Sequence, residues 1–211
     1  MKKRIGLLVT GMLLFSLAAC GKNTAGNQQN AGQTGQSTTE EGTGNTQTNT
    51  PADNETNYGV GVTMSDIRQA LVDTFGENYW PSAEIPEDML QDICGITSDM
   101  YEEYFAEMPM ISTNVDTVII VKAKADQVAA VEEALNAYRD TLVNDTMQYP
   151  MNVGKIQASR IETFGQYVCF VQLGADTMAA AENGEEAVIE KCQQDNELAL
   201  EIIQNTLTKN Q

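Results

Sequence analysis

Cys20 is the residue with the clearest chemical signature in this sequence. It follows Leu17-Ala18-Ala19, and an apolar run from Ile5 to Leu17 and the basic start Lys2-Lys3-Arg4 precede it. A basic start, a short apolar stretch and small residues before a cysteine are typical of a bacterial lipoprotein export signal. We therefore predict a signal peptide over residues 1–19, with the thiol of Cys20 as the acyl acceptor.

The alternative for this segment is a membrane anchor that stays attached. The apolar run is shorter than the roughly 20 residues that a spanning helix needs, and an ordinary secreted protein requires no cysteine at this place. Two or more acyl chains on Cys20 would anchor the chain stably. We expect a protein held on the outer face of a membrane, in an envelope with one membrane or two.

Other chemistry is restricted by the residues that the sequence lacks. Histidine is absent, and no serine has a lysine three residues later. These absences remove Ser-His-Asp and Cys-His nucleophiles, zinc sites that use histidine, and a serine nucleophile with a Ser-x-x-Lys base. Pairs of carboxylates remain possible. We predict no catalytic residue, no cofactor and no metal site, and a carboxylate-based hydrolase of the envelope stays as an alternative.

Three further cysteines are predicted to be buried thiols. Cys94, Cys169 and Cys192 are odd in number and lack the spacing of metal ligands, and Cys169 lies within an apolar strand pattern. A disulfide between Cys94 and Cys192 is the alternative in an oxidising exterior.

The charge balance limits the partners. The chain has a net charge of −18, and residues 58–211 contain 26 acidic and eight basic side chains. Nucleic acids and anionic lipid surfaces carry the same sign of charge, so neither is an expected partner. Solubility explains the excess of acids, with a basic polymer or divalent cations as the alternative. No Asp-x-Asp-x-Asp-Gly loop supports a specific calcium site.

One polar cluster is a candidate site. It follows a long predicted helix, in a loop bounded by Pro150, and loops often carry binding residues. Turn and capping chemistry would also explain it. The candidate rim for a small ligand or a partner chain consists of Asn144, Asp145, Gln148, Tyr149 and Asn152.

The elements that would position these residues lie in one folded domain over residues 58–211. Residues 20–57 hold Cys20 and a tract of Gly, Asn, Gln, Thr and Ser that cannot bury enough apolar surface to order itself. We expect a flexible tether with a reach of about 30–37 Å.

Helices are predicted over 64–75 behind a Thr63/Asp66 capping box, from Pro86 to Gly95, and from Ser98 to Pro109. The third of these would place Tyr101, Tyr104, Phe105 and Met108 on one face. A long helix begins near residue 126, with an apolar stripe formed by Val128, Val131, Leu135, Tyr138 and Leu142. A last helix runs from about 185 to 207, with Val188, Cys192, Ala199 and Ile202 inward and a polar interruption at 193–196.

Strands are predicted over 115–123, 156–164 and 167–173, the last two joined by the Gly165-Gln166 hairpin turn. The third strand is apolar throughout, so we place it between the other two and antiparallel to both. The predicted class is α+β: a small three-stranded antiparallel sheet from a split β-α-β unit, related to the ferredoxin-like fold and packed with N-terminal and C-terminal helices.

Four segments resemble a family of bacterial lipoproteins catalogued as domain of unknown function 4358. The resemblance covers roughly residues 64–174 and the arrangement of signal and linker, and its segments are 102–110, 116–123, 144–150 and Gly165-x-Tyr167-Val168. It implies an exported, lipid-anchored protein and brings no activity or site residue with it. We expect an extracytoplasmic binding or adaptor module without catalytic activity, whose partner is an envelope protein or a small solute.

Overall fold

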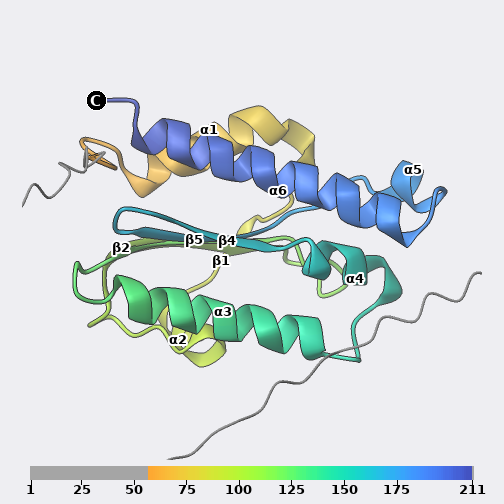
Figure 1. Ribbon diagram of the computed structural model, residues 1–211, viewed down its shortest axis with the longest axis horizontal. Coiled ribbons are helices and arrows are strands. Elements are labelled where there is room, and N and C mark those ends of the chain that lie inside the picture. The colour runs from red at the N-terminus through yellow and green to blue at the C-terminus, as the bar shows by residue number, and fades with distance from the viewer. Residues whose placement is uncertain (1–56, 211) are drawn as a thin grey trace, which may run out of the picture. The chain divides into compact units, whose positions relative to one another are not determined.

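The computed structural model describes residues 57–210, which form three layers with a sheet between two layers of helices (Figure 1). The predicted signal peptide, Cys20 and the tether up to residue 56 lie outside the described residues. The elements in chain order are α1 (Met64–Phe75), η1 (Gly76–Asn78), β1 (Ala83–Glu84), α2 (Glu87–Cys94), β2 (Tyr101–Met108), β3 (Thr117–Ala123), α3 (Val128–Asn144), α4 (Pro150–Gln157), β4 (Arg160–Phe164), β5 (Tyr167–Gln172), α5 (Met178–Ala181) and α6 (Glu185–Leu207).

The sheet has five antiparallel strands in the order β1-β2-β3-β5-β4. The mixed α+β class is confirmed, and β5 lies between β3 and β4 as predicted. The prediction of three strands is wrong because β1 and β2 extend the sheet beyond β3, and the relation to the ferredoxin-like fold is not confirmed. Gly165 has a φ of +60° at the hairpin turn between β4 and β5, a conformation that glycine adopts without strain.

The segment 101–108 is strand β2, where the sequence analysis predicted a helix. Its residues pair antiparallel with β3 from Glu103 opposite Lys122 to Glu107 opposite Val118. Neighbouring side chains enter different cores, Phe105 with α1 and α6 and Ala106 with α2 and α3. Tyrosine and phenylalanine favour strands, and pairing with the buried strand β3 overrides the helical spacing of the aromatic residues.

The predicted strand 156–164 begins later than expected. Residues Pro150–Gln157 form helix α4, and β4 begins at Arg160. Pro150 occupies the first turn of α4, a position where the missing N–H of proline costs no hydrogen bond. The proline that was expected only to stop one helix therefore also starts the next.

Helices α1, α2, α3 and α6 agree with their predictions, whereas the short helix α5 was not predicted. The Thr63/Asp66 capping box is present at the start of α1, and α2 ends at Gly95 in the left-handed conformation. In α3 the apolar stripe packs against the sheet through Val131 and Leu135. In α6 the predicted polar interruption includes Asn196, which is fully buried, whereas Ile202 is only half-buried.

The sheet separates two apolar cores, and β3 and β5 contribute to both. Val118 and Ile120 face the core under α1 and α6, and Ile119 and Val121 face the core under α2 and α3. Among residues 57–210, no helix is long and apolar enough to cross a membrane.

The three cysteines of the described domain are buried and free, as predicted. Burial raises the pKa of Cys94 to about 12 and that of Cys192 to about 11. At pH 8 only about 0.1% of Cys192 would be the reactive thiolate. We expect the native Cys20→Ala chain to react slowly with a chromogenic thiol reagent. The same chain unfolded in urea should react at three thiols per molecule, measured by the absorbance of the released chromophore. Fast labelling of the native protein would contradict the buried placement.

Candidate functional site

Most of the predicted rim is explained by the end of α3 and the start of α4. The Asp145 carboxylate accepts the Met147 backbone N–H and the Gln148 side-chain amide, each at 2.8 Å. The Asn144 side chain donates to the carbonyl of Asp140 within its own helix. Tyr149 occupies the N-cap position of α4 and is exposed. Asn144, Asp145 and Gln148 therefore make the turn and helix-end hydrogen bonds that were the alternative explanation, whereas the Tyr149 side chain makes no capping hydrogen bond.

Asn152, the fifth predicted residue, faces a different surface. It is buried, and its side chain donates to the carbonyl of Thr113 in the loop between β2 and β3 at 3.1 Å. This bond ties α4 to a loop 39 residues earlier in the chain. Asn152 therefore lines a groove that the sequence analysis did not predict.

This groove, the Trp80 groove, has a volume of about 680 Å³. Three connecting segments and two helices contribute to it: the end of η1 with the segment after it, the β2–β3 loop, the β5–α5 connection, α4 and α5. Helices α4 and α5 lie at the end of the sheet opposite the β4–β5 hairpin (Figure 1). Its lining consists of Asn78, Trp80, Ile111, Thr113, Asn114, Met151, Asn152, Lys155, Gly174, Asp176, Thr177, Met178 and Ala181.

Lys155 lines the groove and forms a buried ion pair with Asp116, which lies behind the lining, and we call this pair the floor of the groove. Lys155 Nζ lies 2.7 Å from Asp116 Oδ1, and the two side chains are 6% and 0% exposed. The second carboxylate oxygen accepts the backbone N–H of Gly174 at 3.2 Å. Burial raises the pKa of Asp116 above the ordinary carboxyl value, and the neighbouring Lys155 and the Gly174 N–H oppose that rise. The ion pair with Asp116 offsets the desolvation cost of burying the charged ammonium group of Lys155.

The ammonium group of Lys155 has contacts beyond Asp116. Asn114 Oδ1 lies 3.4 Å from Nζ, and the ring centroid of Trp80 lies 5.0 Å from it. A cation at this distance from an indole ring is attracted by the ring's negative face. The Trp80 indole N–H itself donates to the carbonyl of Glu77 at 3.2 Å, which holds the ring in place at the groove.

The rim of the groove is apolar and exposed to solvent. Trp80 is 42% exposed and Met178 is 81% exposed, and Ile111 and Met151 lie between these limits. Exposed apolar side chains gathered around a hollow mark sites of interaction. Two of the four are methionines, whose flexible side chains adapt to ligands of different shape.

Gly174 lies at the floor of the groove, where the neighbouring side chains leave no room for a Cβ atom. A Cβ atom there would lie 2.6 Å from Cys192 Sγ and 3.0 Å from Lys155 Cγ. We expect Gly174→Ala to lower the free energy of unfolding by about 1–3 kcal/mol through overpacking, measured by urea denaturation. The same change made in a Cys192→Ala background should cost less, because the nearest atom has been removed. Equal costs in both backgrounds would contradict this packing.

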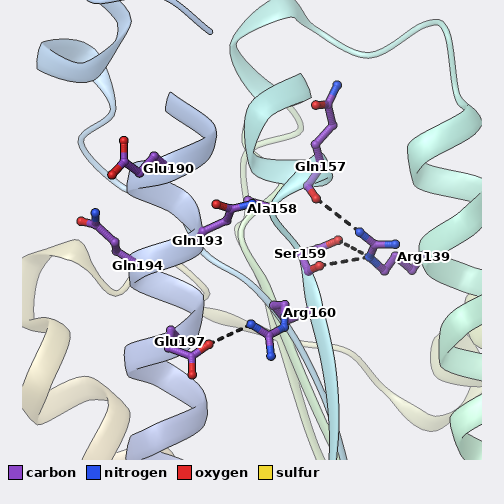
Figure 2. A pocket seen from close by; sticks show the side chains of 9 residues that line it. All are labelled: Arg139, Gln157, Ala158, Ser159, Arg160, Glu190, Gln193, Gln194 and Glu197. Carbon is purple, nitrogen blue, oxygen red and sulfur yellow. Dashed lines mark hydrogen bonds and ion pairs between the residues drawn. The ribbon is translucent and has the colours of Figure 1, made fainter. Parts of the chain in front are cut away.

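A second hollow lies between α6 and the segment that joins α4 to β4 (Figure 2). It contains two arginines, but both are engaged. Arg139 donates to the carbonyls of Ser159 and Gln157 and to the Ser159 hydroxyl. Arg160 pairs with Glu197 at 2.8 Å and with Glu162 at 3.6 Å. The lining of this hollow has no large apolar side chain, whereas the Trp80 groove has Trp80, Ile111, Met151 and Met178, so the Trp80 groove is the stronger candidate.

Neither hollow resembles a metal centre. No group of three or more His, Cys, Asp or Glu side chains is arranged to hold a metal ion within the part of the chain that the structure describes. The lining of the Trp80 groove offers apolar contact at its rim and hydrogen bonding at its floor.

Comparison with known proteins gives one match. The model of a family described as Domain of unknown function (DUF4358) matches residues 76–173. This span includes Trp80, Asp116 and Lys155, and it ends immediately before Gly174. No curated protein and no solved structure was found to match the chain.

Proposed function

We propose that this chain, whose residues 76–173 belong to the DUF4358 family, is a membrane-tethered binding module that holds a small amphiphilic molecule in the Trp80 groove. One observation carries the proposal: four exposed apolar side chains surround a floor made of a buried ion pair. Apolar walls with a few polar groups at fixed positions are characteristic of small-molecule sites.

The size of the groove supports a small molecule as the occupant. Its volume of about 680 Å³ lies within the roughly 300–1,000 Å³ common for ligand pockets. The arrangement also favours binding over hydrolysis, because Lys155 and the Gly174 N–H engage both oxygens of Asp116. A carboxylate held in this way is a poor general acid or base.

Membrane attachment is the second part of the proposal. The first described residues lie beside the β4–β5 hairpin, where Tyr58 packs against Phe164 at a ring-centroid distance of 5.9 Å. Helices α4 and α5, which contribute to the lining of the groove, lie at the opposite end of the sheet (Figure 1). A tether that joins at the hairpin end would leave the groove open to solutes outside the cytoplasm.

The anchor can be tested by fractionation. We expect the natural chain to sediment with membranes and Cys20→Ala to be soluble, because acyl chains supply the membrane affinity. Recovery of both forms with membranes, with residues 1–19 removed from each, would contradict acylation at Cys20.

The sequence contains a single tryptophan, Trp80, so its fluorescence reports on the groove alone. The experiment uses the chain from residue 20 with Cys20→Ala, titrated with dansylamide, an uncharged amphiphilic fluorophore. We expect saturable energy transfer from Trp80 to the dansyl group at one site per chain. No transfer up to millimolar probe would overturn the groove as a small-molecule site.

A matched pair of methionine variants separates the groove from general surface binding. Met178 lines the groove and Met147 does not, and both are more than four-fifths exposed. Met178→Asp should weaken the dansyl titration about tenfold or more, because burying a charge beside an apolar ligand costs at least 1.4 kcal/mol. Met147→Asp should leave the titration unchanged, and equal effects of the two variants would place the probe elsewhere.

A further inference from the structure

We infer that the Trp80 groove selects a ligand whose polar end is an uncharged hydrogen-bond acceptor, such as a carbonyl, amide or hydroxyl group. The inference rests on the proposed function and names the class of ligand. It follows from the charge at the floor of the groove, from the donors available there, and from the charge of the surrounding domain.

The floor carries no net charge. The single ammonium group of Lys155 is matched by the single carboxylate of Asp116 at 2.7 Å, and both side chains are removed from water. The carboxylate oxygens are occupied, one by Lys155 and the other by the Gly174 N–H. A ligand therefore meets a pair that is already neutral, rather than a free cation or a free anion.

The pair still has a donor to offer. An ammonium group has three N–H bonds, and Asp116 takes one of them at a short distance. Asn114 Oδ1 lies at the longer distance of 3.4 Å, and the remaining side of Nζ faces the ring of Trp80. The N–H on that side is the donor left for an acceptor on a ligand, whose apolar part would cover the rim.

An anionic end is disfavoured by the same geometry. It would add a second negative charge to Lys155, which Asp116 already neutralises, and a buried charge without its own partner is costly. The domain adds to this cost, because 26 acidic and eight basic residues over 58–211 repel anions.

A ligand with a cationic end could pair in the groove only with Asp176, the one acidic residue of its lining. Asp176 lines the groove and is exposed, and pairs formed in water contribute little. Deeper in the groove the cation would meet the ammonium group of Lys155. An uncharged end avoids both penalties.

Three probes with one fluorophore test this inference. Dansylglycinamide ends in a neutral amide, dansylglycine in a carboxylate of nearly the same size, and dansylethylenediamine in an ammonium group. Each is titrated into the chain from residue 20 with Cys20→Ala, and Kd is taken from energy transfer from Trp80. We expect the amide to bind at least about tenfold more tightly than either charged probe, with a Kd that changes less than about twofold between 50 and 500 mM NaCl.

The variant Asp116→Asn provides the sharper test. It keeps the shape of the side chain and removes the negative charge, so the ammonium of Lys155 is left uncompensated at the floor. We expect dansylglycine to become the tightest of the three probes in this variant. Circular dichroism and a cooperative thermal transition would establish that the variant is folded.

The outcomes separate the two proposals. Failure of all three probes to bind would overturn the proposed function. Binding in which dansylglycine equals or exceeds dansylglycinamide in the unsubstituted groove would overturn the uncharged ligand alone and leave the binding module standing. The comparison in the unsubstituted groove decides the inference even where Asp116→Asn does not fold.

Discussion

Replacing Lys155 with methionine should lower the free energy of unfolding by about 3–5 kcal/mol, the range found when one partner of a buried ion pair is removed. Methionine fills a similar volume, so the loss reports on charge more than on packing. Asp116 would remain fully buried without its ion-pair partner, and only the Gly174 N–H would still donate to it. Urea denaturation followed by circular dichroism would measure the change.

Lys191→Met provides the matched control. Lys191 forms an ion pair with Asp195 one turn further along α6, and its side chain is 39% exposed. Exposed pairs of this spacing contribute about 0.3–0.5 kcal/mol. Because Asp195 is only 17% exposed, the loss in this variant should exceed that range but stay well below the loss in Lys155→Met. Adding Asp116→Asn to Lys155→Met should recover part of the loss because it removes the unpaired charge. Similar losses in Lys155→Met and Lys191→Met would contradict the description of the groove floor.

The second large effect is expected for Asn196→Leu, which should cost about 2–5 kcal/mol. Asn196 is fully buried in α6, and its side chain bridges two backbone groups. The amide oxygen accepts the N–H of Leu173 and the amide nitrogen donates to the carbonyl of Ala158, each at 2.8 Å. Leucine satisfies neither group, and each unpaired buried group costs about 1–3 kcal/mol.

Gln193→Leu is the control for Asn196→Leu, because it makes the same kind of change at an exposed position of the same helix. It should change the free energy of unfolding by no more than about 0.5 kcal/mol. Hydrogen exchange adds a local readout, since the Leu173 amide should lose protection in Asn196→Leu. A protected Leu173 amide together with parent-like stability would contradict the bridge.

Local sequence signals predicted the elements whose causes are local. Helix α1 was predicted from the Thr63/Asp66 capping box, the end of α2 from Gly95, and the β4–β5 hairpin from Gly165. The apolar composition of β5 also predicted its place between two other strands. Strand β2 was missed because its aromatic residues repeat at a helical spacing, and its real partner β3 begins nine residues after β2 ends.

The candidate site was predicted in only one of its residues, Asn152. Lys155 was missed because it lies directly before the predicted strand 156–164, where a lysine suggests a solvated turn. In the structure it lies in the last turn of α4. Asp116 had one usable signal, since it stands directly before the buried strand β3, where a charged residue requires a partner. Nothing local connects it to Lys155, which lies 39 residues away in the chain.

Local sequence patterns were enough to predict the α+β class, most helices, the central hairpin and the burial of the three cysteines, because capping, glycine conformation and apolar periodicity act over a few residues. It also predicts the export signal and the acylated Cys20. The five-stranded sheet became visible only in the folded structure, as did the contacts of Lys155 with Trp80 in the groove and with Asp116 behind it. These contacts depend on how segments distant in the sequence pack together. The interaction of a buried ion pair forms only when folding removes both charges from water.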